Sequence, residues 1–123
     1  MKTALILFAH GARDPEWANP MRRVQAAVRG SQPGVPVELA FLEFMAPSLP
    51  DCIAGLLADG VNKIVVMPMF IARGGHLKRD VPEMLAALRV AHPQVEFVLG
   101  DAIGEHALVV EAMAAAALQE AGL

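Results

Sequence analysis

The sequence predicts a single α/β domain whose four-stranded parallel sheet carries helices on both faces. Strand-like and helix-like segments alternate regularly along the whole chain, which is typical of a parallel sheet with right-handed crossovers. The strand-like runs are almost continuously apolar, as expected for strands that are covered on both faces. With 123 residues, 55% of them hydrophobic, residues 1–123 are expected to form one domain with a core of its own.

Four apolar runs predict the strands. The first is Thr3–Phe8, and the others are Val35–Phe44, Ile64–Met69 and Val95–Leu99. A strand order of 2-1-3-4 would reverse the direction of the chain across the sheet between strands 1 and 3. Ligands of open α/β sheets bind at such a reversal, outside the carboxyl ends of the strands.

Local start and stop signals predict the first two helices. Asn19-Pro20 is a typical N-cap followed by a first-turn proline, and this helix is expected to run to Gly30. Ser48 with Asp51 three residues later predicts the start of a second helix, which Gly60 would end.

The last two helices have signals of the same kind. Asp80 with Glu83 predicts the start of the third helix, which should stop before His92-Pro93. An alanine-rich segment over residues 105–119 predicts the fourth, with His106 at its opening. We assign His92 and His106 to surface or capping roles.

Composition excludes several classes of function. A net charge of −3 and a pI near 5.7 argue against a nucleic-acid-binding protein. No apolar run approaches the roughly 20 residues that span a bilayer, so no membrane association is expected. The one cysteine, Cys52, permits no internal disulfide, and a buried thiol in a reducing cytoplasm is the expectation.

Two histidines follow strand-like runs and lie in short glycine-marked segments. His10 follows the first strand, and His76 follows the third. Glu43 lies at the end of the second predicted strand, among apolar neighbours. Because the carboxyl ends of parallel strands share one edge of a sheet, these three side chains are expected to converge there.

Neutral imidazoles bind Co²⁺, Ni²⁺, Fe²⁺ or Zn²⁺, and near neutral pH they also accept protons. Glu43 could complete a metal site or carry protons away. Each residue also has a structural interpretation: the histidines as hydrogen-bonded residues of the core or rim, and Glu43 as a side chain that points to solvent. Trp17 could either line a cleft for an aromatic ligand or attach the first helix to the sheet.

Basic residues gather near both histidines in a chain that is acidic overall. Grouped positive charge beside a crevice suits a small polyanionic ligand, although a solvated helix face would explain any one of these residues. They are Arg13, Arg22, Arg23, Arg73, Lys78 and Arg79.

Two segments, residues 7–15 and 68–82, resemble the two signatures of the class II tetrapyrrole chelatases. The chain is most similar to the small, single-domain, CbiX-type sirohydrochlorin chelatases, and the resemblance covers essentially its whole length. It departs at Ala12, where the family often has a serine. That change removes a hydroxyl contact but leaves His10 in place.

The resemblance implies an enzyme that inserts a divalent metal, Co²⁺ first and otherwise Ni²⁺ or Fe²⁺, into sirohydrochlorin or a related tetrapyrrole, without an organic cofactor. By this resemblance, His10 is metal ligand and proton acceptor, and His76 is the second ligand. Glu43 assists with the metal or with proton removal. The implied substrate-binding residues are Arg13, Glu43, Ile71, Ala72, Arg73, Gly74 and Gly75.

Larger class II chelatases resemble two such domains facing each other across a cleft, so this chain corresponds to one half. We therefore expect a homodimer, with the last helix as one possible contact surface. Two alternatives stay open from the sequence. One is a non-catalytic metal-binding or tetrapyrrole-carrier protein on the same scaffold, and the other is an unrelated α/β protein whose histidines are structural.

Overall fold

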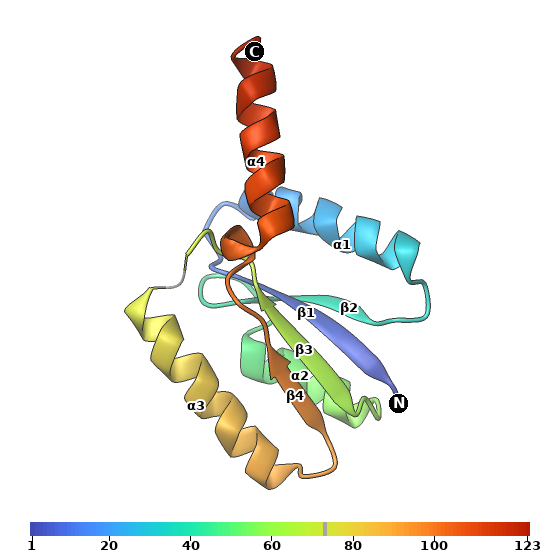
Figure 1. Ribbon diagram of the computed structural model, residues 1–123. Helices are drawn as coiled ribbons and strands as arrows, with labels where there is room; N and C mark the ends of the chain where they lie inside the picture. Colours follow the sequence, from blue (N-terminus) through green and yellow to red (C-terminus); the bar gives the residue numbers. More distant parts are fainter. Residues whose placement is uncertain (73) are drawn as a thin grey trace.

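The computed structural model describes residues 1–72 and 74–123, apart from the side chain of His76. The elements alternate along the chain as the sequence predicts (Figure 1). In order they are β1 (Thr3–Ala9), the short 3₁₀ helix η1 (Pro15–Ala18), α1 (Asn19–Ser31), β2 (Val37–Phe41), α2 (Leu49–Ala58), β3 (Lys63–Pro68), α3 (Gly75–Ala91), β4 (Glu96–Leu99), the 3₁₀ helix η2 (Ile103–Glu105) and α4 (Ala107–Glu120).

The four strands form one parallel sheet in the order β2-β1-β3-β4, which confirms the predicted order. The second strand is shorter than predicted, since it ends at Phe41 and not at Phe44. Phe44 has a φ of 66°, a left-handed conformation that no strand accommodates. The apolar residues after Phe41 therefore belong to the loop that joins β2 to α2.

The larger core lies on the face of the sheet that α2 and α3 cover. Ile6, Ile64 and Val66 of the sheet meet Ile53 of α2 and Leu85 of α3 there, all of them almost completely buried. A smaller cluster on the opposite face joins Ala9 and Phe41 to Ala18, with Met21 of α1 packed against it. Helices therefore cover both faces, as predicted, but unequally.

Two helix starts differ from the prediction. Ala18 is the N-cap of α1, so Asn19 is already helical, because η1 leads directly into this helix. The third helix begins at Gly75 and not at Asp80, and Pro82 lies inside it. Leu77 packs against the larger core, and this burial favours helix through the segment before Asp80.

Other local signals have the predicted outcome. The side chain of Ser48 accepts a hydrogen bond from the backbone N–H of Asp51 at 3.2 Å and caps α2. His106 caps α4 by accepting from the N–H of Leu108 at 3.1 Å, and the backbone of His92 closes α3. Cys52 is a free, buried thiol, and burial followed by the charge of Glu38 raises its pKa to about 11.

The last helix, α4, extends away from the sheet and from the other helices (Figure 1). Among the described residues it packs substantially only against η2. Within the same residues, no helix has the length and apolar character needed to cross a bilayer.

Candidate metal and tetrapyrrole site

The loops after β1 and β2 are joined at the carboxyl edge of the sheet. Backbone hydrogen bonds run from Leu42 N to Ala9 O (2.9 Å) and from Glu43 N to His10 O (3.0 Å). They continue the pairing of β1 with β2 beyond the strands themselves. His10 and Glu43 therefore lie beside each other because of the backbone, before any side-chain contact is considered.

Gly11 allows this close approach. Its φ is 91°, and a Cβ built on it would lie 1.9 Å from the carbonyl oxygen of Glu43. No residue other than glycine fits that space without moving the Glu43 backbone. The glycine therefore lets the backbone of Glu43 lie directly against the backbone that follows His10.

The His10 ring lies between the Gly11 carbonyl and the Glu43 carboxylate. Its Nδ1 is 3.1 Å from Gly11 O, and its Nε2 is 3.4 Å from Glu43 Oε1. A carbonyl oxygen only accepts, so the Gly11 contact requires the proton on Nδ1. In the neutral ring, this tautomer leaves the lone pair of Nε2 facing the carboxylate.

Two electron-pair donors that face each other in this way attract a proton or a cation. Ligands about 2.1 Å from a divalent ion lie about 3.4 Å apart at the tetrahedral angle, which matches the distance between Nε2 and Oε1. Both side chains are about half exposed, at 51% for His10 and 47% for Glu43. The pair is therefore open to an incoming ion, and the prediction that Glu43 meets His10 is confirmed.

The described residues contain no group of three or more His, Cys, Asp or Glu side chains that could hold a metal. His10 and Glu43 provide two donors. The side chain of His76, predicted as the second imidazole ligand, lies outside the described residues. Its backbone belongs to the first turn of α3, and not to a loop as the sequence suggested.

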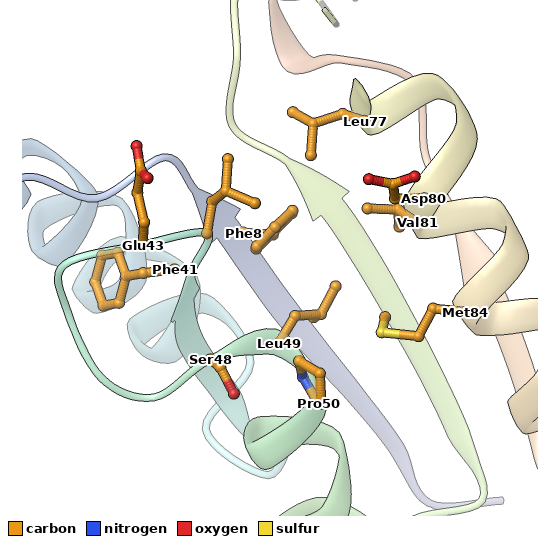
Figure 2. Close-up of a pocket in the computed structure, with 11 residues that line it drawn as sticks. Phe8, Phe41, Glu43, Ser48, Leu49, Pro50, Leu77, Asp80, Val81 and Met84 are labelled. Atoms are coloured by element: carbon orange, nitrogen blue, oxygen red, sulfur yellow. The ribbon is translucent and has the colours of Figure 1, made fainter. Parts of the chain in front are cut away.

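An apolar pocket of about 420 Å³ opens beside Glu43, between the loop after β2 and the first turns of α3. Figure 2 shows Leu77, Val81 and Met84 of α3 facing Phe8 and Leu49 across it. The Glu43 carboxylate points away from this apolar lining, at the upper rim in the same view. The other lining residues are Phe41, Leu42, Ser48, Pro50 and Asp80.

Arg13 is held at the same edge by an aromatic ring. Its guanidinium carbon lies 4.9 Å from the centroid of Phe44, a cation–π geometry. Phe44 is itself exposed and in the left-handed conformation noted above. The resemblance predicts Arg13 as a substrate ligand, but the sequence does not predict its contact with Phe44, because nothing local connects two residues so far apart in the chain.

The loop predicted to lie against a substrate begins after β3. Ile71, Ala72, Gly74 and Gly75 are all exposed, whereas Arg73 lies outside the described residues. From the other side, Gly104 N donates to Phe70 O at 3.0 Å. A Cβ on Gly104 would lie 2.3 Å from Ile71 O, so this loop rests on the backbone of η2.

Both roles considered for Trp17, lining a cleft and attaching the first helix to the sheet, stay predictions. It belongs to η1 and is exposed, whereas its neighbour Ala18 is fully buried. Ala18 therefore attaches this segment to the sheet.

Comparison with known proteins identifies the family. Residues 4–120 of the chain match the protein family described as CbiX. The chain belongs to the CbiX family. It is 35% identical over 106 residues to a protein of Saccharolobus islandicus named sirohydrochlorin cobaltochelatase, covering 81% of both chains. It is 34% identical over 85 residues to a protein of the same name from Methanococcus aeolicus, covering 69% of this chain and 59% of that one.

Solved structures agree with this family assignment. A putative cobalamin biosynthesis CbiX protein from Marinobacter aquaeolei superposes with a TM-score of 0.82 at 28% identity, over 98% of each chain. SirB from Bacillus subtilis, solved with Fe³⁺, gives a TM-score of 0.77 at 25% identity. That match covers all of this chain but 48% of SirB, so the CbiX-family chain spans about half of the SirB chain.

Proposed function

We propose that this CbiX-family protein is a sirohydrochlorin chelatase, which inserts a divalent metal ion into the tetrapyrrole. The observation that carries the proposal is the His10–Glu43 pair, with Nε2 and Oε1 3.4 Å apart at an exposed edge. The names of the Saccharolobus and Methanococcus relatives support the same substrate and metal. Co²⁺ is the first candidate, and Ni²⁺ and Fe²⁺ suit the same ligands.

Insertion exchanges one metal ion for two pyrrole protons, so the site must both deliver a cation and remove protons. In this proposal His10 Nε2 binds the incoming ion, and His76 is the second ligand. When the ion moves from Nε2 to the macrocycle, the freed lone pair accepts the two pyrrole protons one after the other, and the first is passed on before the second is taken. Glu43 is placed to take a proton from His10 and pass it to solvent, because its carboxylate is half exposed.

The substrate would lie along the carboxyl edge of the sheet. An apolar pocket beside an exposed ligand pair suits a tetrapyrrole, which has an apolar ring and charged carboxylate side chains. Arg13, held over Phe44, would bind a substrate carboxylate, which arginine contacts through two parallel hydrogen bonds. We assign Arg73 the same role, and the backbone of Ile71–Gly75 would lie against the ring.

The protein is mixed with Co²⁺ and sirohydrochlorin, and the absorption spectrum is followed against a protein-free control. We expect the spectrum of the metallated product to appear much faster with protein, and each protein to turn over many times. A carrier protein would bind the tetrapyrrole and shift its spectrum without accelerating insertion. Insertion no faster than in the control, with Co²⁺, Ni²⁺ or Fe²⁺, would refute the proposal.

We further propose that the protein acts in the cytoplasm as a homodimer of single-domain chains. SirB has about twice the length of this chain, and one domain offers one side of a cleft. A second copy would supply the other side.

A further inference from the structure

Phe44 combines a strained backbone with an exposed side chain. Its φ of 66° is left-handed, a region that a bulky aromatic residue rarely occupies and that stores strain. The side chain is 56% exposed, so burial of the ring does little to offset this strain. Residues in such conformations gather at functional sites. The conformation of Phe44 therefore points to a role other than packing.

Anchored residues on both sides of Phe44 hold its backbone in place. Before it, Glu43 N donates to His10 O at 3.0 Å. After it, Met45 packs against the smaller core cluster. Because both neighbours are fixed, the chain keeps the left-handed turn between them, and the ring is left exposed at the residue next to Glu43.

The Phe44 ring contacts the guanidinium of Arg13, whose central carbon lies 4.9 Å from the ring centroid. An aromatic ring is a weak hydrogen-bond acceptor, so this contact holds the charge in place and leaves N–H donors for a ligand. Within residues 1–72 and 74–123, no carboxylate forms an ion pair with Arg13. The charge is therefore positioned without being neutralised by those residues.

Two other arginines show the contrast. Arg29 of α1 donates to Val37 O, and Arg89 of α3 donates to Phe97 O, both at 2.8 Å. These guanidiniums attach the last turns of their helices to neighbouring strands. Arg13 instead contacts a ring. A guanidinium held in this way suits a carboxylate from outside the chain, which it can bind through two parallel hydrogen bonds.

We propose that Phe44 is a positioning residue of the tetrapyrrole site, which fixes Arg13 to bind one carboxylate side chain of the substrate. Phe44 directly follows Glu43, so this carboxylate would be bound beside the His10–Glu43 pair. A guanidinium that is already fixed loses less freedom on binding than a mobile one, which tightens the complex. The identity of the ligand rests on the proposed chelatase function.

The test is a titration of the protein with metal-free sirohydrochlorin, followed by absorption, for the parent, two single variants and the double variant. Arg13→Ala should raise Kd about tenfold, a typical effect of losing a hydrogen bond to a charged group. Phe44→Ala should raise Kd about fivefold in the parent chain, but less than about twofold when Arg13 is already alanine. Equal effects in the two backgrounds, or no effect in the parent, would overturn the proposal, because Phe44 would then not act through Arg13.

Two further variants of Phe44 separate positioning from a structural role. Phe44→Gly removes the ring and suits a positive φ, so it should weaken binding as much as Phe44→Ala with a urea midpoint no lower than that of the parent. Phe44→Tyr keeps the ring and should bind within about twofold of the parent. Parental binding by Phe44→Gly would contradict this role. A much lower urea midpoint for Phe44→Gly would do the same, since the ring would then support the fold.

Arg29→Ala is the matched control for charge. Arg29 bonds the first residue of β2, at the end of the sheet opposite to the site, and its loss should change Kd by less than about twofold because salt screens distant charges. Binding by Arg29→Ala as weak as that by Arg13→Ala would mean that only the total charge matters, and it would overturn the role of Phe44.

These titrations contain no metal and need no turnover. A parent protein that binds sirohydrochlorin and shows the coupling of Phe44 with Arg13, but inserts no metal, would refute the chelatase proposal and leave the role of Phe44 intact. A parent protein that binds no sirohydrochlorin would refute the role of Phe44.

Discussion

The carboxyl edge of the sheet and the core beneath it differ in how their residues are held in place. In the core, apolar side chains such as Ile64 and Leu85 are fully buried between the sheet and the helices. At the edge, His10 and Glu43 are half exposed, and Gly11 and Phe44 have positive φ values. Burial of the core side chains stabilises the fold. The residues at the edge are positioned by backbone contacts, and their side chains contribute little to the stability of the fold. Changes at the edge should therefore alter chemistry, and changes in the core should alter stability.

The largest expected effect on stability comes from Leu85→Ala. Leu85 is fully buried against the sheet, and removing a buried leucine side chain costs about 3 kcal/mol of unfolding free energy, including the cavity it leaves. Urea unfolding measures this loss. The exposed Val90→Ala control should change stability by less than about 0.5 kcal/mol. If the folded Leu85→Ala protein also lost its metal insertion, the two regions would not be separate.

Glu43→Gln should slow metal insertion and leave stability almost unchanged, which is the reverse of the result expected for Leu85→Ala. The change keeps the size of the side chain but removes the carboxylate that faces His10 Nε2. We expect kcat for insertion to fall about 100-fold, a typical value for loss of a group that transfers protons. The unfolding free energy should hardly change, because exposed ion pairs contribute little. An unchanged kcat would remove Glu43 from the proton route.

Gly11→Ala should affect both properties, because this glycine joins the two regions. The new Cβ would meet the Glu43 carbonyl, and a positive φ adds strain, for a combined cost of about 2 kcal/mol. Insertion should slow as Glu43 moves from His10. Gly60→Ala is the matched control: its φ is 80° with open space around it, so it isolates the backbone strain. Equal insertion rates in the two variants would mean that the Gly11 contact does not position the site.

Ser48→Ala has the smallest expected effect. It removes the side-chain cap of α2, whose hydrogen bond to Asp51 N is 3.2 Å long. Loss of such a cap costs about 1 kcal/mol. Thermal unfolding should report the loss. Because Ser48 also lines the pocket, KM for the tetrapyrrole is measured in parallel. The cap alone should leave KM unchanged in the folded protein. A rise in KM would therefore show that the hydroxyl contacts the substrate.

The sequence predicts most of the fold, because strands and caps leave local signals. The four apolar runs, the Ser48 cap and the glycine-marked segment after β1 are readable from neighbouring residues. The early start of α3 is not, since burial of Leu77 against distant strands decides it. The same holds in the site. The sequence predicts that His10 and Glu43 meet, because strand ends converge, but not the Arg13–Phe44 contact or the pocket between α3 and the loop after β2.

The most direct test measures Co²⁺ insertion and unfolding on the same preparations of parent and His10→Ala protein. Removal of the imidazole takes away a metal ligand and a proton acceptor from a half-exposed position. We predict a fall in kcat of at least about 100-fold with an unfolding free energy within about 1 kcal/mol of the parent. Insertion at the parental rate by the folded variant would contradict the account.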